Sequence, residues 1–168
     1  MLIRHRTAPD QNGKWSISMV YVFVFFLFLN IVSFAVPKNL SRIEVYATSF
    51  FAYAFGLTTD VVFDLHYDLY GYLSPGFQWL SMLAIIMYFP SVSFLFLNFF
   101  PFHKRMRFKM IYIIVWSVFS TSFEWLTLQT DFFYYNGWKL WYSAVLYPFI
   151  FLILVYNLKL VRRQIANR

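Results

Sequence analysis

Carboxylic acids are the residues in this sequence whose type and position could support chemistry. Five of the seven acidic residues lie inside or just beside long apolar stretches: Asp60, Asp64, Asp68, Glu124 and Asp131. An ionised carboxylate in hydrocarbon costs about 2.5–3.5 kcal/mol on insertion scales, so acids at such positions usually face a protein interior or a wet cavity. They could bind a metal ion, carry a proton or another cation, or hold a polar headgroup.

The spacing of the acids places them on helix faces. Residues at steps of four share one face of a helix, and one such stripe is formed by Thr48, Ala52, Gly56, Asp60, Asp64 and Asp68. A second polar stripe, at steps of three and four, is formed by Ser117, Ser120, Thr121, Glu124 and Thr127. We expect the two stripes to face each other, with His66 and Asp131 at the same depth.

Three interpretations of this candidate polar cluster stay open. The first is a divalent metal site for Mg²⁺, Mn²⁺ or Zn²⁺, with Asp60, Asp64 and Glu124 as candidate ligands. The second is a path for a proton or cation, and the third is a pocket for a polar headgroup. The structural alternative makes Asp64 and Asp68 solvated residues at a helix end and His66 an interfacial residue. Glu124 would then be protonated, or hydrogen-bonded to Ser120 or to a Trp indole. No cofactor is predicted.

Composition requires lipid as the solvent for this chain. Of its 168 residues, 61% are hydrophobic and 12% charged, whereas soluble domains are about 45–50% apolar and about 25% charged. Without Cys there is no disulfide, thiolate metal site or cysteine nucleophile. The net charge of +7 comes from basic residues that flank apolar segments, which indicates topology signals beside anionic lipid. Nucleic acid is not an expected partner.

We predict an all-α, polytopic transmembrane helix bundle that forms a single domain over residues 1–168. About 20 apolar residues are needed to cross the hydrocarbon layer, and open strands cannot satisfy their backbone there. The predicted spans cover residues 16–36, 45–64, 77–99, 110–129 and 141–158. The second segment is interrupted by Thr58, Thr59 and Asp60, so the alternative is four spans plus a re-entrant segment.

The positive-inside rule orients the bundle with its C-terminus in the cytoplasm. Five spans then place ten Lys and Arg inside and four outside, whereas four spans place eleven inside and three outside. Both topologies put the loops 65–76 and 130–140 outside and the basic loop 101–109 in the cytoplasm. The acids therefore lie near the outer surface.

Aromatic residues gather at the same outer level and predict an interfacial belt. Its members are Trp79, Trp125, Trp138, Trp141, Tyr134, Tyr135 and Tyr142. Glu124-Trp125, the run Phe132-Phe133-Tyr134-Tyr135-Asn136-Gly137-Trp138, and Trp141-Tyr142-Ser143 together resemble a functionally uncharacterised family of small multi-pass membrane proteins from spore-forming Gram-positive bacteria. The resemblance covers roughly residues 85–145. It implies an integral protein of the bacterial cytoplasmic membrane and implies no activity.

Three functions fit these residues. The first is a non-enzymatic accessory subunit, or a small-solute or ion pathway, with its acidic cluster near the outer face. The second is an intramembrane metal-dependent enzyme acting on a lipid or isoprenoid headgroup. The third is a structural or assembly factor. We favour the non-enzymatic first function. Because five helices leave little room for a private path, we expect a homo-oligomer or a larger membrane complex as partner, beside the lipid bilayer.

Overall fold

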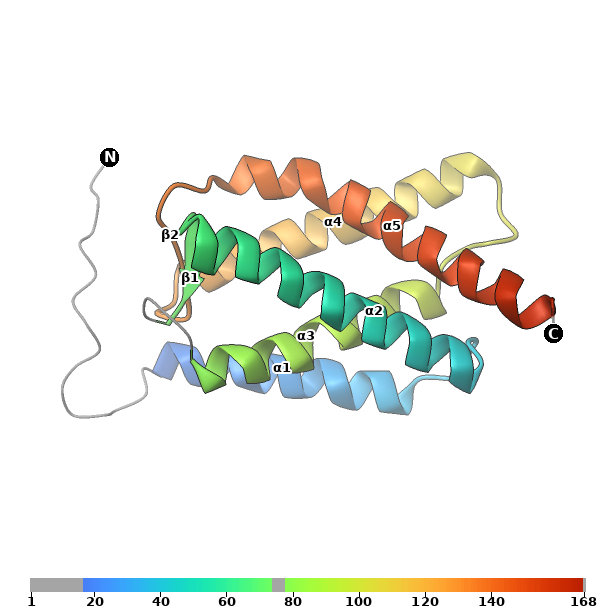
Figure 1. Cartoon of the computed structure of the whole chain (residues 1–168), viewed down its shortest axis with the longest axis horizontal. Helices are drawn as coiled ribbons and strands as arrows, with labels where there is room; N and C mark the ends of the chain where they lie inside the picture. Colours follow the sequence, from blue (N-terminus) through green and yellow to red (C-terminus); the bar gives the residue numbers. More distant parts are fainter. Residues whose placement is uncertain (1–16, 74–77, 168) are drawn as a thin grey trace.

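The computed structural model describes residues 17–73 and 78–167, and five α-helices run back and forth along one common axis in it (Figure 1). The helices are α1 (Ile17–Ala35), α2 (Arg42–Asp60), α3 (Trp79–Asn98), α4 (Met106–Leu128) and α5 (Leu140–Ala166). A π-helical turn, Val61–His66, extends α2. Two short strands, β1 (Tyr70–Tyr72) and β2 (Phe133–Tyr135), lie at one end of the bundle. The predicted basic N-terminal tail and the first residue of the first span lie outside the described residues.

Three of these helices, α3, α4 and α5, are long and apolar enough to cross a membrane. Their bounds agree with the predicted spans within a few residues, except that α5 continues well beyond residue 158 to Ala166. The apolar part of α1, Met19–Ala35, is shorter. The predicted second span is divided in the structure, because α2 ends at Asp60 and the π-helical turn follows.

The start of α2 is encoded locally by a capping box. Ser41 Oγ accepts the Glu44 N–H at 3.3 Å, and the Glu44 carboxylate accepts the Ser41 N–H at 2.6 Å. Both bonds satisfy backbone donors that have no partner inside the helix. After the π-helical turn that extends α2, Asp68 has a φ of 49°. Asp tolerates this left-handed conformation better than most residues, and it turns the chain from the π-helical turn into β1.

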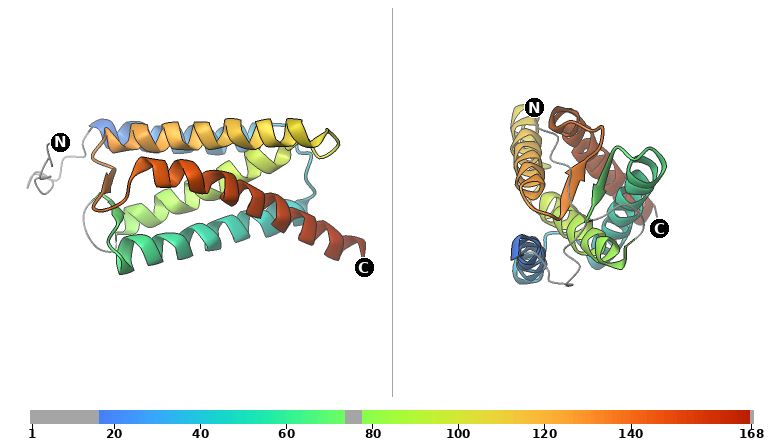
Figure 2. Two further views of the ribbon diagram at one scale, coloured as in Figure 1. Left: turned by 90° about the horizontal axis from the view of Figure 1, so that it is seen from above. Right: turned by 90° about the vertical axis from the view of Figure 1, so that its left-hand side faces the viewer.

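Large apolar side chains fill the bundle between the helices. α2 packs mainly on α3 and α5, α4 packs on α5, and α1 packs on α3 (Figure 2). Around Phe96, Phe151 and Leu158 one buried cluster fills the half of the bundle away from the strands. A second cluster around Phe26, Phe132 and Phe133 lies under the strands. The space between the two clusters is bordered by α2, α3, α4 and α5.

The two strands form an antiparallel ladder that the all-helical prediction missed. β1 and β2 come from the loops after α2 and after α4, and they pair Gly71 with Tyr134. The Leu69 carbonyl oxygen accepts three backbone N–H bonds, from residues 136, 137 and 138, each at 2.9 Å. The ladder lies across the end of the bundle (Figure 2), where water can satisfy its outer edges. We call this end of the molecule the ladder end.

The opposite end is held by polar contacts between its loops and helix ends. Asn98 accepts the Asn39 N–H at 2.7 Å and donates to the Pro37 carbonyl at 2.9 Å. Arg162 of α5 forms an ion pair with Glu44 of α2 at 2.6 Å. These contacts bring the loop before α2, the end of α3 and the end of α5 together. We call this end the basic end, because it carries most of the described Lys and Arg.

Candidate functional site

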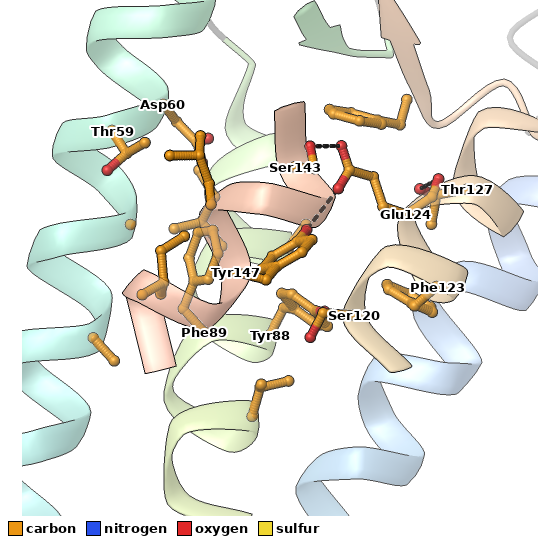
Figure 3. Close-up of a pocket in the computed structure, with 18 of the residues that line it drawn as sticks. Thr59, Asp60, Tyr88, Phe89, Ser120, Phe123, Glu124, Thr127, Ser143 and Tyr147 are labelled. Carbon is orange, nitrogen blue, oxygen red and sulfur yellow. Dashed lines mark hydrogen bonds between the residues drawn. The ribbon is translucent and has the colours of Figure 1, made fainter. Parts of the chain in front are cut away.

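A cavity of about 190 Å³ lies between α2, α3, α4 and α5 and extends to the ladder. Two acids line it, Asp60 from α2 and Glu124 from α4, and they approach it from opposite walls (Figure 3). Both side chains are buried, with 7% and 8% of their surfaces exposed. Among the 28 described residues that line the cavity there is no Lys, Arg or His. The cavity therefore places two acidic side chains in a largely apolar wall with no basic partner among the described lining residues.

Glu124 is held by three hydroxyl groups. Ser143 of α5 donates to Oε1 and Tyr147 of α5 donates to Oε2, each at 2.7 Å (Figure 3). Tyr135 of β2 also donates to Oε1, at 2.5 Å. The Trp138 indole N–H donates to the Ser143 hydroxyl at 2.8 Å, which leaves the Ser143 proton directed at Glu124. The expected partners, Ser120 or an indole directly, are replaced by this set. Glu124 thus has an oriented environment of neutral donors.

Asp60 has a similar environment built from β1. Tyr70 donates to Oδ1 at 2.8 Å, and Tyr72 lies within hydrogen-bonding distance of both carboxylate oxygens, at 3.4 and 3.3 Å. The two tyrosines alternate with Gly71, so both rings leave the strand on its inner face. The ladder therefore contributes side chains to both acids, Tyr70 and Tyr72 to Asp60 and Tyr135 to Glu124.

The ladder tyrosines remain neutral donors at working pH. Burial raises the pKa of Tyr70, and the charge of Asp60 raises it further, with smaller effects from Asp64 and Glu124. Burial, followed by the charge of Asp60, also raises the pKa of Tyr72 well above its usual value. The pKa of Tyr135 is raised by burial and then by its hydrogen bond to Glu124.

The remaining acids and the predicted imidazole lie away from the cavity. Asp64 is half-buried and does not line it, and Asp68 is exposed and accepts a 2.7 Å hydrogen bond from Asn136. His66 is exposed with its ring against Tyr67, and Asp131 is exposed as well. Of the six candidate polar residues, the structure brings two, Asp60 and Glu124, into one cavity.

The two polar stripes are buried as the spacing predicts, but only in part. In α2 the buried residues include Thr48, Ala52, Gly56 and Asp60, and the stripe then leaves the interior where the π-helical turn changes the helix periodicity. In α4 the buried polar residues are Ser117, Ser120, Glu124 and Thr127, whereas Thr121 is half-buried. Both stripes border the cavity, while the principal helix contacts of α2 are with α3 and α5.

Sequence reasoning missed the hydroxyl groups that hold the acids. The sequence pattern predicts Tyr135 and Trp138 as members of the interfacial belt and gives Tyr70, Tyr72 and Tyr147 no role. Of the other predicted belt members, Trp79, Trp125 and Trp141 are 82%, 50% and 60% exposed. The alternation Tyr70-Gly71-Tyr72 was an available strand signal, but its pairing with residues 133–135 is not readable from local sequence.

Metal ligation by this cavity would rely on few protein oxygens. No group of three or more His, Asp or Glu side chains that could hold a metal ion occurs within residues 17–73 and 78–167. Of the three candidate ligands, Asp60 and Glu124 line the cavity and Asp64 does not. Hard divalent cations take six or more oxygens, so two carboxylates and several hydroxyls would need water or a substrate to complete the set.

Comparisons with protein-family models, with curated proteins and with solved structures found no match to this chain.

Proposed function

We propose that this chain is a multi-pass membrane protein that binds a small cation, the proton included, between Asp60 and Glu124. It would act as a small-solute or ion pathway, or as an accessory subunit of one. The observation that carries the proposal is the pair of buried carboxyl groups on one cavity without a basic residue among the described residues that line it. Hydrogen bonds from hydroxyl groups satisfy the carboxyl oxygens of Asp60 and Glu124, but they cannot neutralise the charge of an ionised carboxylate.

The energetics favour a cation in such a cavity. A buried, unpaired charge is costly, and proteins relieve the cost by pairing it, by ligating a cation or by protonating it. Ser143, Tyr135 and Tyr147 can each donate only one proton, and each already directs it at Glu124. Their oxygens keep unused lone pairs that a cation can also contact. The site thus offers negative charge together with neutral oxygens.

For the topology we propose five spans, with the ladder end outside and the basic end in the cytoplasm of a bacterial cell. In the four-span alternative, the loop before α2 faces outside while the loop 101–109 faces the cytoplasm. The hydrogen bonds between Asn39 and Asn98 favour five spans, because they join these two regions at one end. Among described residues, nine Lys and Arg lie at or near the basic end and Lys139 lies at the ladder end, in agreement with the positive-inside rule.

The test compares two double variants of the full chain. Asp60→Asn/Glu124→Gln removes both cavity carboxylates, and Asp68→Asn/Asp131→Asn removes two exposed carboxylates from the same end as a control. Each protein is studied by native mass spectrometry after gentle extraction, and by decay of a pH gradient in liposomes. We expect the wild type and the control to retain a bound non-covalent mass or a proton flux, and the cavity variant to lose at least about nine-tenths of it.

Equal behaviour of all three proteins in both assays would contradict the proposal and leave the cavity acids with a structural or assembly role. A bound divalent metal together with a lipid, both lost in the cavity variant, would instead support the intramembrane enzyme acting on a lipid or isoprenoid headgroup.

A further inference from the structure

The basic end carries far more positive than negative charge. Nine of the described Lys and Arg lie at or near it, and Glu44 is the one described acid beside them. Glu44 is already paired with Arg162. Eight cations therefore have no acidic partner at this end among the described residues: Lys38, Arg42, Lys104, Arg105, Arg107, Lys109, Lys159 and Arg163.

Tertiary contacts bring these cations together from segments far apart in the sequence. Arg162 of α5 pairs with Glu44 of α2, and its guanidinium lies 4.5 Å from the centre of the Phe102 ring in the loop before α4. Asn39 and Asn98 join the loop before α2 to the end of α3. The start of α2, the loop before α4 and the end of α5 therefore hold their cations at one end of the bundle. Because these cations repel one another, the surface favours a partner with several negative charges.

The length of α5 brings part of this charge to the level of lipid headgroups. Its 27 residues correspond to about 40 Å, whereas the hydrocarbon layer is about 30 Å thick. The helix begins beside the exposed Trp141 at the ladder end, and its last turns project past α2 (Figures 1 and 2). Lys159 and Arg163 are exposed on this projecting part, and their spacing of four residues puts them on one face of the helix.

Exposed apolar side chains lie among the cations. Met106 and Phe108 are exposed on either side of Arg107, and Leu160 and Ile165 are exposed on the last turns of α5. Segments that combine exposed bases with exposed apolar side chains lie at the membrane interface, where the apolar atoms enter the acyl region and the bases meet anionic headgroups. A nucleic acid would leave these apolar side chains in water. The surface therefore fits a phospholipid better than a nucleic acid.

We infer that the basic end is a binding surface for anionic phospholipids, whose phosphates contact Lys159, Arg163 and the cations of the loop before α4. Their acyl chains lie against the neighbouring exposed apolar side chains. A lipid that binds only the folded bundle also stabilises it. This surface lies at the opposite end of the molecule from the cavity, so the inference does not depend on the cation proposed to bind there.

Lipid titrations of the full chain test this surface. The protein in a neutral detergent is titrated with phosphatidylglycerol or with phosphatidylcholine of the same acyl chains, and native mass spectrometry counts the lipids that it retains. We expect phosphatidylglycerol to be retained at a concentration about tenfold lower than phosphatidylcholine. The difference should shrink at high salt, because salt screens exposed charges. Thermal unfolding in the same mixtures should move to higher temperature with phosphatidylglycerol and stay unchanged with phosphatidylcholine.

Paired substitutions assign the lipid preference to residues. Lys159→Gln/Arg163→Gln removes two cations from α5 and should reduce the preference at least about threefold. The matched control, Lys159→Arg/Arg163→Lys, keeps both charges and should keep the preference. Lys104→Gln/Arg105→Gln, in the loop before α4, should also reduce it, whereas Lys139→Gln at the ladder end should leave it unchanged. Circular dichroism and gel filtration verify that each variant is folded.

Two results would overturn the inference. The first is equal retention of the two lipids by the wild type. The second is a preference for phosphatidylglycerol that survives both neutralising pairs, because the lipid would then bind elsewhere on the chain. A short fluorescent DNA oligonucleotide is tested beside the lipids. If it binds through these cations and phosphatidylglycerol is not preferred, the surface takes nucleic acid and the assignment to lipid is wrong.

Discussion

Glu124 illustrates how a buried acid can be hydrogen-bonded inside an apolar bundle without being neutralised by a basic residue. Four hydroxyl and indole groups orient around it, either directly or through Ser143. None of them carries a positive charge that would neutralise the acid permanently. A carboxylate paired with Arg would be satisfied and closed to a ligand, whereas one held by hydroxyls stays available to a proton or another cation.

Glu44 shows the opposite arrangement at the basic end. Its carboxylate caps α2 through Ser41 and pairs with Arg162, whose guanidinium also lies 4.5 Å from the centre of the Phe102 ring. Burial raises the pKa of Glu44, but the hydrogen bonds from Arg162 and Ser41 outweigh burial and lower the pKa overall. This acid is therefore structural, because it joins α2 to α5.

The lowered pKa of Glu44 predicts an acid-sensitive contribution to stability. That contribution is complete above the unfolded-state pKa of about 4.5, and it is lost as the pH falls through the lower folded-state pKa. Glu44→Gln keeps the capping box, since Gln also serves at that position, but loses the ion pair. Because Arg162 is 38% exposed, we expect a loss of about 1 kcal/mol or less near neutral pH.

Thermal unfolding of the wild type and of Glu44→Gln, measured from about pH 7 to about pH 3, checks this prediction. The difference between the two should shrink as the pH falls, and Asp131→Asn serves as the exposed-acid control. A difference that stays constant over this range would show that the charge of Glu44 has no part in it.

The ladder joins two loops that are some 60 residues apart and supplies tyrosines to both cavity acids. A short two-stranded ribbon is marginal alone. Here it is supported by the packing of Tyr70, Phe132 and Phe133 in a buried cluster and by the three N–H bonds to Leu69. The ladder thus covers one end of the bundle and supplies tyrosines to the candidate site.

The contact between α2 and α3 depends on the absence of a side chain at Gly56. A Cβ atom there would overlap the ring of Phe89, which itself lines the cavity. Small residues allow this close approach of helices in membrane proteins, where packing rather than hydrophobic burial drives association. Helix spacing and cavity width are therefore set by the same residue.

Gly56→Ala is expected to destabilise the bundle. Overpacking costs about 1–3 kcal/mol, and the better helix propensity of Ala returns less than about 1 kcal/mol. Displacement of Phe89 should also narrow the cavity and weaken the cation binding proposed for it. Thermal unfolding and calorimetry measure both effects. Gly137→Ala is the matched control, because its Cβ would meet only Leu69, at an ordinary 3.5 Å; equal effects of the two substitutions would contradict this account.

The molecule as a whole has two chemically different ends. The five helices run between them in alternating directions (Figure 1). At the ladder end lie the cavity acids and exposed Trp side chains, and at the basic end lie the clustered Lys and Arg. The positive-inside rule uses such an uneven distribution of Lys and Arg to orient a membrane protein. In the proposed topology it places the candidate site near the outer surface.

Single cysteines test that topology, because the chain has no Cys of its own. Lys38, Lys104 and Lys139 are all exposed. With five spans, a membrane-impermeant maleimide added to intact cells should label Lys139→Cys at once, and should label Lys38→Cys and Lys104→Cys only after permeabilisation. Labelling of Lys38→Cys in intact cells would favour the four-span alternative.

The sequence alone predicted a helical chain apolar enough for a membrane, located its long apolar helices, and placed Asp60 and Glu124 on polar stripes that the structure buries. These properties depend on hydropathy and on helical periodicity, which are local. Only the tertiary structure decided which acids share a cavity, since Asp64 leaves the stripe at a π-helical turn. It also decided that Tyr70, Tyr135 and Ser143 contact these acids, because strand pairing and burial between helices depend on contacts between residues far apart in the chain.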